Sequence, residues 1–404
     1  MRKKKRKNRG CFPFLVLLVG LSVLIWKYRG ILNTPVETIL WTMRTDHESM
    51  NLQELMEERK EVDESEVQSK FYYSQMEDEG KLIYRELLWG LREGASDIFI
   101  HSGDAGLISE TLDGVLADNP DLFWMDGSGE ILSRENSSVY SPNYNCTAEE
   151  RSRKQGEIDQ AASECLGGLP DGASEYDRLK YIYDYIVNTT DYNTSAKDSQ
   201  NIYSALVNRE SVCAGYSKML QYLLEKLGME CIYVMGTAGN QESHAWNIVK
   251  CEGSYYQVDV TWGDPVFMAA EGEEIPPELT IDYDYLCCTD EEIRRNHAPD
   301  TRYDYPACTA VDCNYYRRNG LYYEEYDEQV FWQAMNDSIS KGESQTVFKF
   351  ADAGLYRQAE TVIMDDMIVR AASNLAEIYG LEKVRYAYTA NEQMNKIVLL
   401  WNYE

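Results

Sequence analysis

The fold of this protein is decided by residues 211–228, which have the sequence SVCAGYSKMLQYLLEKLG. Its apolar side chains recur at the spacing of one helix face: Tyr216, Met219, Leu220, Leu223, Leu224 and Leu227. Ser211 is a favoured helix cap and Gly228 a favoured helix end, so Cys213 is predicted to lie in the first turn. Unpaired backbone N–H groups and the helix dipole favour a thiolate there. Cys213 is therefore a candidate nucleophile, although on this helix alone a cysteine that only packs is the simpler interpretation.

A second stretch, residues 243–262, has the sequence SHAWNIVKCEGSYYQVDVTW and predicts a β-hairpin. Its turn is expected at Glu252 and Gly253, because glycine supplies the backbone conformation that tight hairpin turns need. With this turn, His244 and Asp259 lie on one face as diagonal neighbours, about 7–8 Å apart at the backbone. That separation lets the carboxylate reach an imidazole nitrogen.

Cys213, His244 and Asp259 together have the chemistry that nucleophilic catalysis needs. An imidazole deprotonates the thiol and later protonates the leaving group, and a carboxylate fixes the tautomer and orientation of the ring. Asp264 is a rival to Asp259, but it lies past the strand and beside a proline. The chain has four histidines, His47, His101, His244 and His297. Of these, only His244 shares a hairpin face with an aspartate and follows a cysteine at the start of a helix.

Residues 176–265 resemble the transglutaminase-like superfamily of cysteine enzymes in three blocks: VCAGYSKML with Cys213, SHAWNIV with His244, and YYQVDVTWGDP with Asp259. The resemblance implies an α+β fold with a papain-like core, in which the helix that carries the cysteine packs on an antiparallel sheet. It implies Cys213 as nucleophile, His244 as general base and acid, and Asp259 as the residue that orients His244. It implies no metal ion or other cofactor for the triad; animal transglutaminases use calcium, and no matching loop is present.

One feature of papain-like proteases does not carry over. They place a glutamine that stabilises the oxyanion a few residues before the cysteine, whereas LVNRES precedes it here, and the nearest amides are Gln200 and Asn208. We therefore expect the backbone N–H of Cys213 to be one oxyanion donor. Trp246 and Trp262 are expected either to line the cleft or to pack in the core.

The first 30 residues are expected to be a targeting segment. MRKKKRKNRG carries seven basic side chains, and the apolar run Cys11–Trp26 follows it. Because no small-residue cleavage site follows that run, we expect an uncleaved signal-anchor helix rather than a cleaved signal peptide. The basic end stays inside the cell, so the protein is predicted to be a single-pass bacterial cell-membrane protein with an extracellular catalytic domain.

The charge of the chain restricts its partners. It has 39 Lys and Arg against 68 Asp and Glu, which gives a formal net charge of −29. A surface this acidic repels phosphate backbones, so nucleic acid is not an expected partner. The expected partners are the membrane, through the N-terminal helix, and a protein or peptide substrate such as a cell-wall-associated one.

Composition and hydrophobic pattern divide the chain into five predicted parts. They are the signal anchor (1–30), a juxtamembrane stalk (31–64), an N-terminal α/β domain (65–145), the transglutaminase-like catalytic domain (146–315) and a C-terminal α/β domain (316–404). Arg134–Cys146 is the best boundary, because it is rich in Ser, Asn and Pro. Residues 267–279 are expected to be an acidic loop, with a lid as the alternative.

Eight more cysteines follow the predicted membrane helix, and they do not form the pattern of a disulfide scaffold or a zinc site. They are Cys146, Cys165, Cys231, Cys251, Cys287, Cys288, Cys308 and Cys313. A surface disulfide among them and free thiols both remain open from the sequence.

The predicted activity is attack on peptide or glutamine amide bonds through a thioester, with hydrolysis favoured over transfer to an amine. A protein-glutamine cross-linking enzyme is the first alternative. The second is a non-catalytic surface scaffold, or a binding module that uses the 31 tyrosines of the chain.

Overall fold

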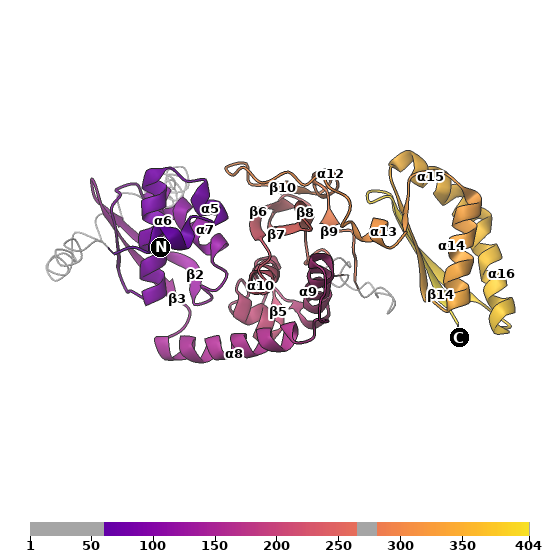
Figure 1. Ribbon diagram of the computed structural model, residues 1–404, viewed down its shortest axis with the longest axis horizontal. Coiled ribbons are helices and arrows are strands. Elements are labelled where there is room, and N and C mark those ends of the chain that lie inside the picture. Colours follow the sequence, from indigo (N-terminus) through magenta and orange to yellow (C-terminus); the bar gives the residue numbers. More distant parts are fainter. Residues whose placement is uncertain (1–59, 265–280, 404) are drawn as a thin grey trace, which may run out of the picture. The chain divides into compact units, whose positions relative to one another are not determined.

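The computed structural model describes residues 60–264 and 281–403, and Glu61–Glu404 form one compact unit. The predicted signal anchor, most of the predicted stalk and residues 267–279 lie outside the described residues. Within the described ranges, no helix is both long and apolar enough to cross a membrane. Three larger sheets follow one another along the chain, each with its own helices (Figure 1).

The first sheet is antiparallel, with the strand order β1-β3-β2. Its strands are β1 (Ile98–Ile100), β2 (Met125–Ser133) and β3 (Ser138–Tyr144), and its helices are α4 (Glu64–Val67), α5 (Phe71–Ser74), α6 (Asp78–Glu93) and α7 (Ala105–Asp118). Helix α6 is followed by Gly94, whose φ is 71°, and α7 stops before Pro120. A glycine and a proline thus mark the ends of these two helices.

The stretch Arg134–Cys146, expected from its composition as a domain boundary, contains a strand. Strand β3 lies within this stretch and is the middle strand of the first sheet, with Ser138 and Tyr140 buried. A side chain at Gly129 would collide with the Tyr140 ring, at 2.4 Å from its Cε2, so this glycine lets the two strands pair. Polar composition predicted a loop here, whereas packing of the Tyr140 ring selects a strand.

The region predicted as the transglutaminase-like domain combines helices with a five-stranded antiparallel sheet of order β10-β6-β7-β8-β9, and this confirms the predicted mixture of α and β structure. The sheet strands are β6 (Cys231–Ala238), β7 (Glu242–Cys251), β8 (Ser254–Val258), β9 (Leu286–Cys288) and β10 (His297–Pro299). The other elements are α8 (Ala148–Leu166), α9 (Glu175–Thr189), the π-helix η1 (Tyr203–Asn208), α10 (Cys213–Lys226), α12 (Asp290–Ile293) and the short pair β4 (Asp191–Tyr192) and β5 (Glu210–Ser211).

Helix α10 is fixed on the sheet by buried polar contacts as well as by its apolar face. Ser217 Oγ donates to the carbonyl of Ala245 at 2.9 Å, and Asn247 Nδ2 donates to the carbonyl of Ser217 at 3.1 Å. Ala245 and Asn247, the two partners of Ser217, lie on β7, which also carries His244. The orientation of α10 against the strand that bears His244 is thereby set.

The β7–β8 hairpin has the predicted register. Cys251 pairs with Ser254, and Asn247 pairs with Val258. Glu252 and Gly253 form the turn with φ values of 50° and 86°, the positive range that favours glycine.

The start of α10 differs in one detail from the prediction. Its N-cap is Val212, which makes no side-chain cap hydrogen bond, and Cys213 is the first helical residue. Ser211, predicted as the cap, is the last residue of β5, and its Oγ donates to the carbonyl of Ser199 at 2.5 Å. The expected cap was inferred from neighbouring residues in the sequence alone. In the structure, the Ser211 hydroxyl instead bonds to Ser199, in a loop that is twelve residues earlier in the chain.

The C-terminal sheet has the order β11-β12-β14-β13 and is covered by helices on the face that carries its core (Figure 1). Its elements are α13 (Tyr315–Arg318), β11 (Tyr322–Tyr323), α14 (Glu328–Lys341), β12 (Gln345–Phe350), α15 (Ala353–Val362), the π-helix η2 (Ile363–Met367), α16 (Ile368–Tyr379), β13 (Arg385–Asn391) and β14 (Lys396–Asn402). Helices α15 and α16 are thus joined by a π-helical turn.

Candidate active site

Cys213 is placed at the N-terminus of α10 and is half-buried. In this position its thiol lies where the first backbone N–H groups of the helix have no partner within the helix. Cys213 also acts on His244, because its side chain is among the groups that raise the pKa of the imidazole. The cysteine is therefore neither buried in the core nor isolated from the predicted base.

His244 lies between the cysteine and the predicted carboxylate. Its Nε2 is 2.7 Å from Asp259 Oδ2, and both side chains are buried. Burial opposes the charged imidazolium, but the Asp259 carboxylate and the Cys213 side chain outweigh it and raise the pKa of His244 to about 10. The ring is therefore held in its protonated form at neutral pH, as an ion pair with Asp259.

Asp259 is held by four hydrogen bonds. Its Oδ2 contacts His244 and His297, and its Oδ1 accepts from the backbone N–H groups of Thr261 at 2.9 Å and Trp262 at 3.1 Å. Burial would raise the pKa of this carboxyl, but the two histidines hold it below its usual range. Asp259 is thus ionised and cannot rotate without breaking several contacts.

Asp264, the rival carboxylate, has a different role. Its Oδ2 accepts a hydrogen bond from Tyr216 Oη at 3.2 Å, and the same hydroxyl donates to the carbonyl of Thr190 at 2.5 Å. Asp259, and not Asp264, is the carboxylate that the structure places against His244.

His297 is the residue of this site that the sequence did not predict. It begins β10, the edge strand that lies beside β6. Its ring is buried, and Nε2 lies 2.9 Å from Asp259 Oδ2. Asp259 therefore has two imidazole partners, and elsewhere His101 contacts Glu86. No local signal could have found His297, because its strand pairs with β6 and not with the hairpin.

The two tryptophans surround these rings in different ways. Trp246 is fully buried, stacks near the His244 ring at 6.0 Å between centroids, and donates through Nε1 to Gln257 at 2.8 Å. Trp262 is half-buried, and its ring centroid lies 4.7 Å from that of His297. Trp246 therefore packs in the core, whereas Trp262 lies closer to the surface of the site.

His244, Asp259 and His297 also have the residue types of a metal site. One ligand atom from each lies within 4.8 Å of the others, and two histidines with a carboxylate are a common zinc set. Here both Nε2 atoms are already in hydrogen-bond contact with one carboxylate oxygen. The contact between His244 and Asp259 is also the one expected of a thiol–imidazole–carboxylate triad.

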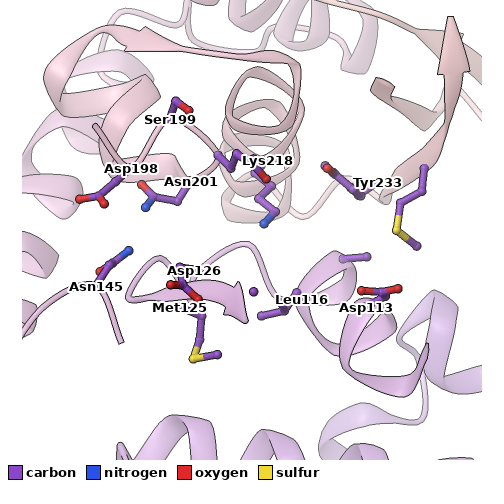
Figure 2. Close-up of a pocket in the computed structure, with 14 residues that line it drawn as sticks. Asp113, Leu116, Met125, Asp126, Asn145, Asp198, Ser199, Asn201, Lys218 and Tyr233 are labelled. Atoms are coloured by element: carbon purple, nitrogen blue, oxygen red, sulfur yellow. The ribbon is translucent and has the colours of Figure 1, made fainter. Parts of the chain in front are cut away.

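A cleft of about 450 Å³ lies beside the start of α10 (Figure 2). One wall comes from α7 and β2, and the other from residues 198–201, α10 and β6. Ser199 in this cleft accepts a hydrogen bond at 3.1 Å from the N–H of Val212, the residue before Cys213. Burial and then the charge of Cys213 raise the pKa of Tyr233, another lining residue. The cleft therefore adjoins the backbone that precedes Cys213, although Cys213 is not one of its lining residues.

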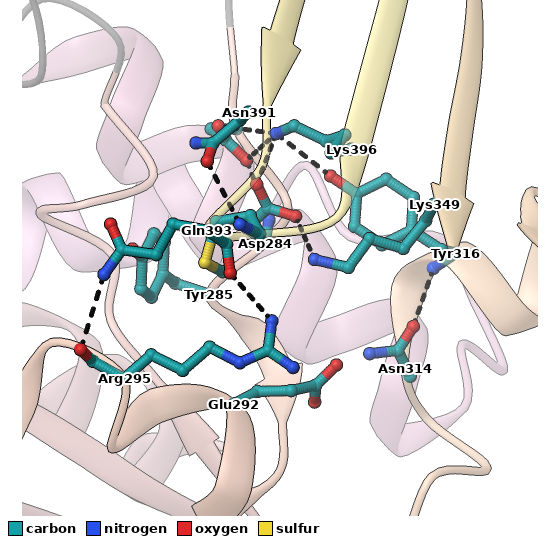
Figure 3. A network of polar contacts seen from close by, with 12 residues as sticks. Asp284, Tyr285, Glu292, Arg295, Asn314, Tyr316, Lys349, Asn391, Gln393 and Lys396 are labelled. Carbon is teal, nitrogen blue, oxygen red and sulfur yellow. Dashed lines mark hydrogen bonds and ion pairs between the residues drawn. The ribbon is translucent and has the colours of Figure 1, made fainter. Parts of the chain in front are cut away.

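The backbone that supports Asp259 is fixed from the C-terminal sheet by buried ion pairs (Figure 3). Lys349 Nζ lies 2.7 Å from Asp284 Oδ1, and Lys396 Nζ lies 2.8 Å from Asp282 Oδ2. The next residue, Tyr285, accepts a hydrogen bond from the N–H of Asp259 at 3.0 Å. A short chain of contacts thus links β12 and β14 to the triad carboxylate.

Comparison with known proteins gives a match to this same region. Residues 163–260 match the model of the transglutaminase-like superfamily, a range that includes Cys213, His244 and Asp259 but not His297. Kyphoscoliosis peptidase of Mus musculus is 27% identical over 111 residues, and that of Homo sapiens is 26% identical over 111 residues. Each alignment covers 24% of this chain and only 17% of the relative.

Solved structures give weaker likenesses. A TGase crystal structure has a TM-score of 0.26 and 16% identity, with 37% of this chain and 47% of that chain covered. A candidate cysteine protease from Cytophaga hutchinsonii has a TM-score of 0.24 and 16% identity, with 33% of this chain and 57% of that chain covered. The family assignment rests on the sequence match and on the order of the three residues. Residues 163–260 of this chain are a domain of the transglutaminase-like superfamily.

Proposed function

We propose that this protein is a cysteine hydrolase that cleaves peptide or glutamine amide bonds through a thioester on Cys213. One observation carries the proposal: His244 is shared between Cys213 and a buried, ionised Asp259, which is the arrangement that generates a nucleophilic thiolate. The relatives named as peptidases support the same class of reaction.

Acylation uses the groups at the start of α10. The Cys213 thiolate attacks the carbonyl carbon, and the oxygen takes up the negative charge beside the free N–H groups of the helix terminus. His244 gives its proton to the leaving nitrogen, the C–N bond breaks, and ammonia or an amine departs. Asp259 stabilises the imidazolium and keeps Nε2 as the nitrogen that carries a proton toward it.

Deacylation decides between the two candidate activities. In hydrolysis, His244 takes a proton from water as the oxygen attacks the thioester carbon, and the C–S bond breaks to release the carboxylic acid and Cys213 thiolate. With a primary amine in place of water, the same steps give a new amide and therefore a cross-link. Hydrolysis is favoured because the sequence offers no identifiable tunnel for an amine and Cys213 is partly open to solvent.

The location of the enzyme is part of the proposal. The basic first ten residues and the apolar run Cys11–Trp26 would hold the chain in a membrane, with the catalytic domain outside the cell. Cell-wall peptides or surface proteins would then be the accessible substrates.

The test uses the full-length chain and a glutamine-containing peptide, with and without a primary amine. Peptide fragments or released ammonia, unchanged by added amine, are expected for the hydrolase. A stable amine adduct would favour the cross-linking enzyme. If the wild type forms no product beyond those of Cys213→Ala, both activities are rejected. The non-catalytic scaffold is then the remaining alternative.

A further inference from the structure

The cleft beside α10 contains one charged side chain whose position is not explained by contacts within the protein. Lys218 lies on α10, five residues after Cys213, and its ammonium points into the cleft (Figure 2). Among the described residues, no carboxylate lies within 4.0 Å of its Nζ. Its Nζ lies over the face of the Tyr233 ring, 5.8 Å from the centroid.

The carboxylates of the cleft have interactions of their own. Asp126 Oδ1 accepts from the N–H and the hydroxyl of Ser128, at 2.8 and 2.7 Å. Asp198 lies 3.6 Å from Lys154 Nζ, and Asp113 is influenced by the charge of Arg302. The cation of Lys218 is therefore the unmatched charge in this cleft.

Such a cation is costly unless a ligand compensates it. Burial alone lowers the pKa of Lys218 to about 8, because few groups replace the water that an exposed ammonium would have. A carboxylate that enters the cleft would supply both the opposite charge and hydrogen-bond acceptors. A lysine side chain that only packed its methylene groups would instead extend its ammonium to bulk water.

We propose that Lys218 binds a carboxylate of the peptide substrate, and so makes this cleft an acidic-peptide subsite of the enzyme. The inference rests on the proposed function, since it takes the cleft to serve Cys213. Five residues of helix advance about 7.5 Å and turn about 140° around the axis, and an extended peptide advances about 3.3 Å per residue. The carboxylate is therefore expected two or more residues from the carbonyl that Cys213 attacks.

The neighbouring aspartates define what kind of anion fits. Asp113, Asp126 and Asp198 repel a phosphate dianion more strongly than a single carboxylate. The ligand group is either the side chain of Asp or Glu, or the carboxyl terminus of a short peptide. Both have the same chemistry, so peptides must distinguish them.

The experiment compares peptides that differ at one position only. This position lies two or more residues away from the amide that Cys213 attacks. One set carries Glu, Gln or Lys at that position, and a second set ends there as a free acid or as an amide. Each is tested on the full-length wild type, Lys218→Met and Lys218→Arg. Lys226→Met, on the same helix but outside the cleft, is the matched control.

The wild type is expected to prefer the Glu peptide, or the free acid, by at least about tenfold in kcat/KM, mainly through KM. Lys218→Met should remove this preference, Lys218→Arg should retain most of it, and Lys226→Met should keep it unchanged. A preference that survives in Lys218→Met, or a wild type indifferent to the charge, overturns the proposal.

Binding separates this result from failure of the proposed activity. The same peptides are titrated into Cys213→Ala with and without Lys218→Met, which needs no turnover. Tighter binding of the acidic peptide that depends on Lys218 supports the subsite even if no peptide is cleaved. Turnover without such binding rejects the subsite and leaves the hydrolase in place. Thermal unfolding confirms that each variant is folded.

Discussion

His297 Nε2 lies 2.9 Å from Asp259 Oδ2, the same carboxylate oxygen that His244 Nε2 contacts at 2.7 Å. For one oxygen to accept from both rings, each Nε2 must carry a proton. Nδ1 of His244 is then the ring nitrogen left for Cys213. His297 therefore helps to hold the Asp259 carboxylate, which in turn holds the His244 ring.

The first prediction follows from this contact. His297→Leu removes one donor from a buried, ionised carboxylate, so Asp259 loses its fixed orientation. We expect kcat to fall about 10- to 100-fold with a smaller change in KM, since small displacements at a reacting site are costly. His297→Gln, which retains an N–H donor, should recover part of the loss. Equal kcat values in Leu, Gln and wild type would remove His297 from the mechanism.

The second prediction concerns the triad itself. Cys213→Ala should abolish turnover, and Asp259→Asn should lower kcat by about 10²- to 10⁴-fold through the wrong imidazole tautomer. Asp264→Asn is the control, because that carboxylate contacts Tyr216 instead. Steady-state kinetics on one peptide measures all three. A larger loss in Asp264→Asn than in Asp259→Asn would show that the wrong carboxylate has been assigned.

The third prediction is a pH dependence of stability. The pKa of His244 is raised to about 10 in the folded protein, against about 6.5 in an unfolded chain. The stabilisation from its proton is therefore complete below pH 6.5 and is lost as the pH rises toward 10. Denaturant unfolding at pH 6.5, 8 and 9.5 should show a decline for the wild type that is shallower in His244→Gln. Parallel curves for the two proteins would contradict the raised pKa.

The fourth prediction tests the support that reaches Asp259 from the C-terminal sheet. Lys396→Met leaves Asp282 and Asp284 without one buried counter-charge, which typically costs about 3–5 kcal/mol of unfolding free energy. Lys341→Met removes an exposed lysine and should change stability by less than about 0.5 kcal/mol. Denaturant unfolding measures both. A loss no larger in Lys396→Met than in Lys341→Met would mean that the network does not stabilise the protein.

The fifth prediction concerns the N-terminal segment. If Cys11–Trp26 anchors the protein, the full-length chain should fractionate with membranes, and deletion of residues 1–30 should release it into the soluble fraction. Immunoblotting of the two fractions measures this. A mature protein that begins near residue 30 in the soluble fraction would instead indicate cleavage.

Sequence alone could predict the parts of the site that depend on local pattern. The hairpin register followed from the turn at Glu252 and Gly253, and the position of Cys213 followed from the apolar face of its helix. Both signals lie within about 20 residues of the group that they place. The turn alone is enough to place His244 and Asp259 on the same face of the hairpin.

The remaining features depend on contacts between distant segments. His297 reaches Asp259 because β10 joins the sheet beside β6, and β3 is a strand because the Tyr140 ring packs over Gly129. Ser211 makes a loop contact in place of the expected cap. Each of these outcomes was decided by packing partners that local composition does not encode.

The most direct test of the central claim is the rate at which each thiol is alkylated. The full-length chain is treated briefly with limiting iodoacetamide, and the labelled cysteines are identified by mass spectrometry. Cys146 is the internal control, because it is also half-buried and its pKa is raised by burial. Cys213 is predicted to react at least about tenfold faster than Cys146, and to lose this advantage in His244→Ala. Equal rates for the two cysteines, or a fast Cys213 that does not depend on His244, would contradict the account.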